Sequence, residues 1–200
     1  LCIQATIEKK GWDHAKELAR QNLLDLIPMI QWNYENGIQV FRLSSDMFPH
    51  LSNPSFPAYD YSLDFARPLL YEIGAKAYEY SQRLSMHPGQ YNQIGASSES
   101  VFQKTVLDLR CHADILDVIE EDLDFYDNMG IICIHGGGTY GDKQGTVERW
   151  CRNFYRLPVN VQRRVAIENC EKCYNVEDCL AISERLNIPV IFDLHHYQCY

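Results

Sequence analysis

The feature that most constrains the fold is a regular alternation of short apolar runs with amphipathic stretches. The runs are rich in β-branched and long aliphatic residues, as is typical of parallel strands that are covered on both faces. Six such runs are present: Leu1–Ile7, Ile38–Leu43, Arg83–His87, Gly130–His135, Arg164–Glu168 and Pro189–Leu194. This order predicts a parallel sheet whose strands are joined by right-handed helical crossovers.

Between the runs, apolar residues recur at the spacing of a helix face. The first such stretch carries Leu23, Leu26, Ile27, Ile30 and Tyr34, with Gly37 placed as a helix C-cap. Similar patterns predict four more helices, around 66–77, 115–123, 147–155 and 176–186.

The residues at the ends of the runs indicate which parallel fold this is. No Gly-x-Gly-x-x-Gly follows the first run, as a dinucleotide-binding sheet would require. Residues able to bind metal end four of the runs instead: His87, His135, Glu168, and Asp193 with His195 and His196. Functional groups at successive strand ends are typical of a barrel. We therefore predict an α/β fold, a TIM-type (β/α) barrel with about six of its eight βα units in a single domain 1–200, apparently truncated at the C-terminus.

The same residue types suit a divalent metal ion. Histidine nitrogen and carboxylate oxygen bind Mn, Zn, Fe or Mg, and several carboxylates shift the preference toward the harder ions. Each of these residues alone has a structural explanation, because His87 before Pro88 could cap a strand and His135 before three glycines could hold a tight turn. Such residues together at the equivalent ends of four runs favour a metal site.

Two loops carry further candidates. The run Gly136-Gly137-Gly138, followed by Lys143, could cradle a phosphate through its backbone N–H groups, or could be an ordinary loop. Gln90 and Tyr91 follow His87 on a short loop and could wedge into a duplex, or could be surface residues. Arg42 stands at the end of the second run, where its positive charge could contact a phosphate group.

Composition narrows the class of protein. The net charge is −9, from 18 basic and 27 acidic residues, which favours a small-molecule enzyme unless bound metals supply positive charge locally. No apolar run approaches the roughly 18 residues of a membrane span, and no secretory leader opens the chain. The eight cysteines are therefore expected as reduced thiols. The Cys170–Cys173 pair has zinc-like spacing but no second pair to match it.

Several strings together resemble the UV-damage endonucleases. They are Phe41-Arg42-Leu43-Ser44-Ser45-Asp46-Met47-Phe48-Pro49, Leu84-Ser85-Met86-His87-Pro88-Gly89-Gln90-Tyr91, Ile134-His135-Gly136-Gly137-Gly138 with Tyr140-Gly141-Asp142-Lys143, Glu168-Asn169 followed by Glu171, and Val190-Ile191-Phe192-Asp193-Leu194-His195-His196. The resemblance implies a TIM-type barrel related to endonuclease IV-like and xylose isomerase-like enzymes. It also implies a DNA repair nuclease that cleaves double-stranded DNA on the 5′ side of UV photoproducts with divalent metals, most often manganese, with magnesium or zinc as alternatives.

Position by position, the resemblance assigns roles. The implied metal ligands are His87, His135, Glu168, Asp193 and His196, with His195 left open. Glu168 and Lys143 are the implied catalytic residues, and the implied contacts to DNA or lesion are Gln90, Tyr91, Arg42 and Gln4. A further family histidine corresponds here to Asn53 or His50, and later family ligands would lie beyond Tyr200. We expect a monomer without membrane association, cytoplasmic (nucleoid-associated) or nuclear, and not secreted.

Two alternatives remain at this point. A sugar isomerase or epimerase on the same barrel would suit the acidic charge better, but it would leave Gln90, Tyr91 and the glycine loop without a role. A non-catalytic fragment that binds damaged DNA is the other.

Overall fold

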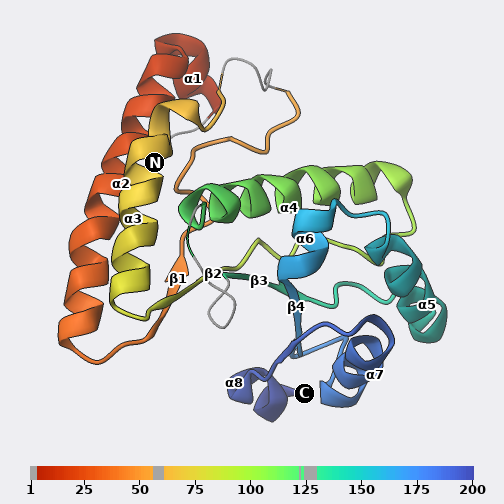
Figure 1. The fold of residues 1–200 in the computed structure, drawn as a ribbon. Coiled ribbons are helices and arrows are strands. Elements are labelled where there is room, and N and C mark those ends of the chain that lie inside the picture. Colours follow the sequence, from red (N-terminus) through yellow and green to blue (C-terminus); the bar gives the residue numbers. More distant parts are fainter. Residues whose placement is uncertain (1–3, 56–60, 122, 124–129) are drawn as a thin grey trace. The chain divides into compact units, whose positions relative to one another are not determined.

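The computed structural model describes residues 4–55, 61–121, 123 and 130–200. The chain divides into two compact units. The first comprises Leu1–Met86 with Asp114–Gly130, and the second comprises His87–Ala113 with Ile131–Tyr200. Long helix α4 (Glu99–Ile119) carries the chain from the second unit back into the first (Figure 1).

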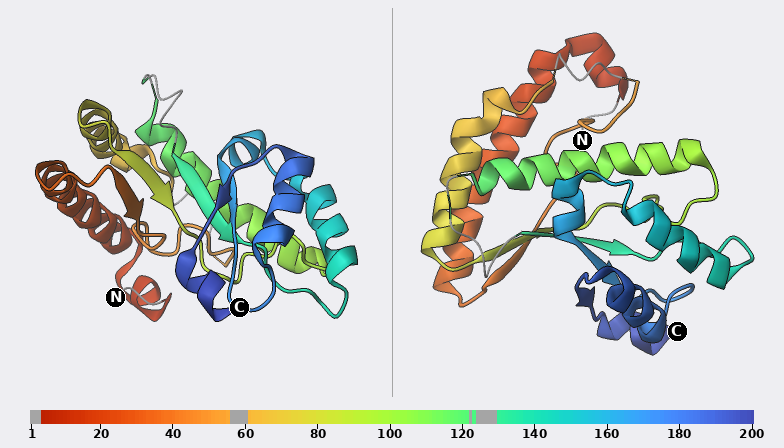
Figure 2. Two further views of the ribbon diagram at one scale, coloured as in Figure 1. Left: turned by 90° about the horizontal axis from the view of Figure 1, so that it is seen from below. Right: turned by 45° about the vertical axis from the view of Figure 1, so that its right-hand side comes forward.

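The first unit combines helices with two parallel strands. Its elements are α1 (Gln4–Lys10), α2 (Trp12–Glu35), β1 (Val40–Leu43), the short 3-10 helix η2 (Asp64–Ala66), α3 (Arg67–Glu79) and β2 (Arg83–Met86). Helices α2 and α3 lie side by side (Figures 1 and 2). Strands β1 and β2 pair in parallel, with Phe41 opposite Leu84. The C-cap of α2 is Asn36, and the predicted cap residue Gly37 follows it in a left-handed conformation with φ 70° that suits glycine.

The expected strand Leu1–Ile7 is wrong over its described part. Leu1–Ile3 lie outside the described residues, but Gln4–Lys10 form α1. Glutamine, alanine, glutamate and lysine are strong helix formers, and Lys9 and Lys10 lie in the last turn, where cations favour a helix. The described residues therefore contain five strands, one fewer than the six predicted.

The second unit alternates three strands with helices. Its elements, besides the start of α4, are β3 (Ile131–His135), α5 (Lys143–Phe154), α6 (Val159–Arg164), β4 (Val165–Glu168), α7 (Val176–Leu186), β5 (Val190–Ile191) and α8 (Leu194–Cys199). Strand β4 pairs in parallel with β3 on one side and β5 on the other. All four residues of β4 are buried, as is expected of a strand covered on both faces.

Element boundaries in this unit follow their caps. Helix α7 has the predicted bounds because Asn175 and Asp178 form a reciprocal capping box at its start. Four expected ends of this unit's strands differ from the structure: Gly130 and Pro189 precede β3 and β5, while Arg164 and Leu194 belong to helices. Arg164 is the last residue of α6, and Leu194 begins α8 because the side chain of Asp193 accepts the N–H of His196 as an N-cap.

The cysteines of the described residues are free thiols, as predicted, while Cys2 lies outside the described part of the chain. The Sγ of Cys170 accepts the backbone N–H groups of Cys173 and Tyr174, so this thiol takes part in a local turn. In the described part of the chain, no helix combines the length and the apolar character that crossing a bilayer requires.

Candidate metal centre

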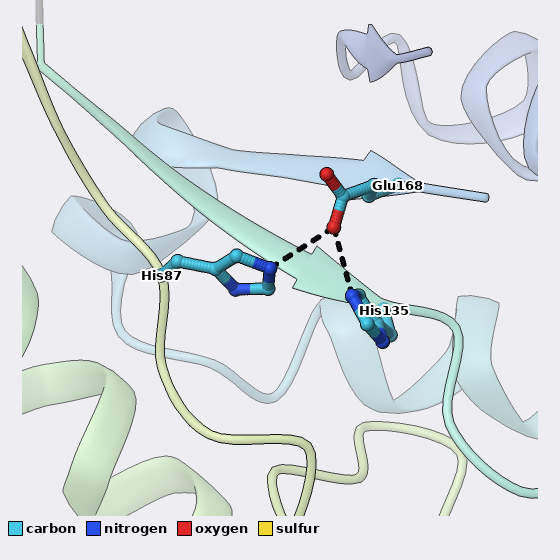
Figure 3. A group of neighbouring side chains, drawn as sticks. All are labelled: His87, His135 and Glu168. Carbon is cyan, nitrogen blue, oxygen red and sulfur yellow. Dashed lines mark ion pairs between the residues drawn. The ribbon is translucent and has the colours of Figure 1, made fainter. Parts of the chain in front are cut away.

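The centre begins with two neighbouring strands that end at the same level. In the parallel pairing of β3 with β4, His135 lies opposite Glu168, and each is the last residue of its strand. Their side chains therefore start from adjacent points at the carboxyl end of the strands. His87, the residue directly after β2 in the chain, brings a second imidazole to the same place (Figure 3).

One carboxylate oxygen lies between the two imidazoles. Oε2 of Glu168 is 2.8 Å from Nε2 of His135 and 3.0 Å from Nε2 of His87 (Figure 3). The carboxylate is only 2% exposed, and the two histidine rings lie 5.0 Å apart. Their three ligand atoms lie within 4.8 Å of one another. Two nitrogen donors and one oxygen donor converging in this way suit a divalent cation.

The electrostatics of Glu168 favour its charged form. Burial acts to raise its pKa, but His135 and His87, close to Oε2, outweigh burial and hold the pKa of this carboxyl well below its usual range. Among the described residues, neither Glu168 Oε2 nor His135 Nε2 has a hydrogen-bond partner of good geometry, although both are buried. A buried charge in this position is well matched by a metal ion.

A second group of possible ligands shares Glu168. Ligand atoms of Glu168, Asp193 and His196 also lie within 4.8 Å of one another. The Nδ1 of His196 is 2.9 Å from the backbone carbonyl of Asn169, to which it donates in the tautomer that leaves Nε2 free to bind a metal. The structure thus places His196, rather than His195, in this group. The Nε2 of His195 lies 3.9 Å from the Sγ of Cys199.

Asn169 is a residue of the site to which the sequence analysis gave no role. Its side-chain Nδ2 donates to the carbonyl of Asp193 at 2.9 Å, and its Oδ1 accepts the N–H of Asp193 at 2.8 Å. Its side chain is buried, and it directly follows Glu168. It therefore ties the backbone at one potential ligand to the strand that carries another. Its sequence signals were that position, one residue after a strand-end glutamate, and its place in the Glu168-Asn169 string.

The loop after His87 presents the two residues expected to contact a lesion. Gln90 is exposed, and Tyr91 is 67% exposed. The tyrosine ring folds back over Gly89, where a Cβ would lie 2.5 Å from the ring. Tyr91 therefore stands at the surface of the second unit, on the loop that begins with the ligand candidate His87.

The remaining predicted residues have other surroundings. The ammonium of Lys143 pairs with the carboxylate of Asp178 and lies 3.4 Å from the hydroxyl of Tyr200. Burial acts to lower the pKa of Lys143, but the contact with Asp178 outweighs it and raises the pKa, so this lysine is charged. Arg42 is exposed on β1 of the first unit, and Gln4 is exposed on α1, where it donates to Glu8.

The two alternative residues for the missing family histidine also lie in the first unit. Asn53 accepts the N–H of Ser55 at 3.0 Å, and His50 adopts a left-handed backbone conformation with φ 62°. Their roles remain predictions.

Known structures resemble this one at two levels. The protein described as "Crystal Structure of SacUVDE" matches with a TM-score of 0.86 and 37% identity over 94% of this chain and 62% of its own. D-psicose 3-epimerase from Clostridium cellulolyticum H10 matches with a TM-score of 0.60 over 87% of this chain and 60% of its own, at 12% identity. The second likeness concerns the fold alone. Together they confirm the predicted α/β class and its TIM-type barrel.

Relatives with known names agree with the first match. The UV-damage endonuclease of Schizosaccharomyces pombe is 39% identical over 98% of this chain and 32% of its own length. The UV DNA damage endonuclease of Clostridium perfringens is 37% identical over 94% of this chain and 44% of its own. The chain thus spans less than half of these relatives. The sequence model of the family described as UV-endonuclease UvdE matches residues 3–200. By that match over nearly its whole length, the chain belongs to the UV-endonuclease UvdE family.

Proposed function

We propose that this chain carries part of the catalytic centre of a DNA repair endonuclease that nicks the phosphodiester on the 5′ side of UV photoproducts by metal-assisted hydrolysis. The observation that carries the proposal is the buried carboxylate of Glu168 between the imidazoles of His87 and His135. Family membership supplies the substrate class, since the relatives are named for damage in DNA.

The residues present fit a divalent cation in two adjoining positions. His87, His135 and Glu168 would hold one ion, and Glu168, Asp193 and His196 a second, with manganese as the proposed metal. When bound, such ions supply a nucleophilic water near neutral pH and stabilise developing charge on the phosphate. The chain itself contributes a fixed set of donors, because Asn169 and the N-cap at Asp193 hold the second group in place.

Recognition of the lesion is proposed for the loop after His87. A photoproduct weakens stacking and pairing, so moving it out of the duplex costs less than moving intact bases. The exposed ring of Tyr91 offers a surface on which a base could stack, and Gln90 offers an amide for hydrogen bonding. Arg42, Gln4 and the charged Lys143 are proposed to contact the phosphate backbone, where salt-dependent attraction operates.

The experiment that tests this function compares damaged with undamaged DNA. Full-length protein is incubated with manganese and either irradiated or untreated plasmid, and nicking is followed on a gel. A duplex with a single photoproduct then locates the cut. We expect nicking of irradiated DNA only, 5′ to the lesion, and its loss on chelation. Equal nicking of both plasmids, or cleavage elsewhere, would contradict the proposal.

A further inference from the structure

The side-chain amide of Gln93 joins two loops of the second unit. Its Nε2 donates to the backbone carbonyl of Gln90 at 3.1 Å, within the loop that carries Tyr91. Its Oε1 accepts the backbone N–H of Gly138 at 2.7 Å and the hydroxyl of Tyr140 at 3.1 Å. A carbonyl at one end and an N–H at the other leave the amide one orientation. Both of its ends are therefore used between the loops.

The loop of glycines is shaped around this amide. Gly137 has φ 90°, a backbone conformation that residues other than glycine rarely adopt. A Cβ at this position would lie 2.6 Å from Oε1 of Gln93. The neighbouring N–H of Gly138 donates to that same oxygen. The glycine run thus lets the backbone that follows His135 approach Gln93 closely, and the N–H of Gly138 is engaged by protein rather than turned toward an anion.

The base of the other loop is anchored on α4. The backbone N–H of Gln93 donates to the hydroxyl of Thr105 at 2.9 Å, and Nδ2 of Asn92 donates to the carboxylate of Asp108 at 2.7 Å. Thr105 and Asp108 are both buried. The same Nδ2 is 3.1 Å from the carbonyl of Gly89. The backbone on both sides of Tyr91 is therefore held, and the Gln93 amide adds a sideways link to the loop after β3.

We propose that Gln93 is a positioning residue for lesion recognition. It holds Gln90 and Tyr91 at a set place relative to the loop that follows the ligand candidate His135. Conformational entropy of these exposed side chains is then lost during folding, so that less of it is lost when damaged DNA binds. The inference rests on the proposed function and adds to it a residue that itself has no contact with the lesion.

Binding measurements on full-length protein test this role. Affinities for a duplex with one photoproduct and for the same duplex without it are measured at one salt concentration. Gln93→Ala should lower the ratio of the two affinities about three- to tenfold, because it removes hydrogen bonds that hold the loop. Tyr140→Phe keeps the ring and removes one of those bonds, so its loss should be smaller. Gln103→Ala, which removes an exposed glutamine on α4, should leave the ratio unchanged.

A double-mutant cycle separates positioning from general stability. In a Gln90→Ala, Tyr91→Ala background, Gln93→Ala should produce no further loss of discrimination, because it acts through those two side chains. Metal content and the midpoint of thermal unfolding are recorded for every variant. If Gln93→Ala does not fold, Gln93→Glu replaces it. That variant keeps the acceptor for Gly138 and Tyr140 but cannot donate to Gln90, and a reduced ratio is again expected.

The outcomes decide between the two proposals. An unchanged ratio in Gln93→Ala, equal losses on both duplexes, or losses that add in the triple variant would each overturn the positioning role. A wild-type protein with no preference for damaged duplex would instead refute the proposed function itself.

Discussion

Replacing Glu168 by glutamine is a sharp perturbation of the candidate metal centre, because it removes one charge and keeps the shape of the side chain. Without metal, two effects oppose each other. The charged carboxylate lies close to two imidazole nitrogens, at 2.8 and 3.0 Å, and glutamine would weaken both contacts. The buried charge, however, costs several kcal/mol in desolvation, which glutamine largely avoids. We expect the metal-free stability to change by no more than about 2 kcal/mol.

With metal present, the change should be larger, because Glu168 belongs to both candidate groups. Loss of an outer partner of a ligand costs about 10–100-fold in metal affinity, so loss of a direct anionic ligand should cost at least about 100-fold. At a metal concentration 100 times Kd, binding stabilises the wild type by about 2.7 kcal/mol, and after a 100-fold loss only about 0.4 kcal/mol remains. The difference corresponds to a Tm that is lower by roughly 5–9 °C for a domain of this size.

The assay measures three quantities on full-length protein: bound metal, Tm with and without manganese, and nicking of irradiated plasmid. Glu168→Gln should lose bound metal, the metal-dependent rise in Tm and the nicking activity together. Glu184→Gln, at an exposed position on α7 of the same unit, serves as the matched control and should behave as wild type. Wild-type metal content and turnover in Glu168→Gln would refute the assignment of this carboxylate as a shared ligand.

Three further predictions concern the same unit. His196→Ala should reduce bound metal in elemental analysis, whereas His195→Ala should not; the reverse result would move the ligand to the neighbouring histidine. Asn169→Ala should lower the free energy of urea unfolding by about 1–3 kcal/mol, because both of its bonds to the backbone of Asp193 are lost, and a value near zero would contradict that link. Burial raises the pKa of Cys179 to about 12, so its thiol should resist alkylation at pH 8 in the folded protein, as mass spectrometry would show. Since the pKa of this thiol in the unfolded chain is near 9, the free energy of unfolding should fall as the pH rises from about 9 to 12. The Cys179→Ala variant should lack the part of this decrease that the thiol causes.

Local sequence determined much of the secondary structure. Helix α7 begins and ends as predicted, because a capping box at Asn175 and the left-handed Asn187 mark its two ends. The predicted strand Leu1–Ile7 is wrong over its described part. The prediction relied on the β-branched residues of this segment, although strong helix formers surround them. Arg164 and Leu194 were misplaced because a short helix lies close to each strand: α6 ends at Arg164, directly before β4, and α8 begins at Leu194, with two residues between it and β5.

Most residues of the candidate site could also be predicted from the sequence. Parallel strands end at one edge, so metal-competent residues at run ends could be expected to meet, and His135 does lie opposite Glu168. That reasoning specifies which strand end a residue occupies, but not where its side chain points. It could therefore not choose between His195 and His196, since neighbouring residues differ by a rotation that the N-cap at Asp193 sets.

Only tertiary structure decided the contacts between segments that are distant in sequence. The amide of Gln93 meets Gly138 across 45 positions, and Asn169 meets Asp193 across 24. No motif or period in the sequence predicts either contact, because a hydrogen bond between two loops depends on where the packed strands and helices place them. The sequence by itself determined which chemical groups line the strand ends. The fold decided which of them share one carboxylate oxygen, and which polar side chains hold the loops beside them.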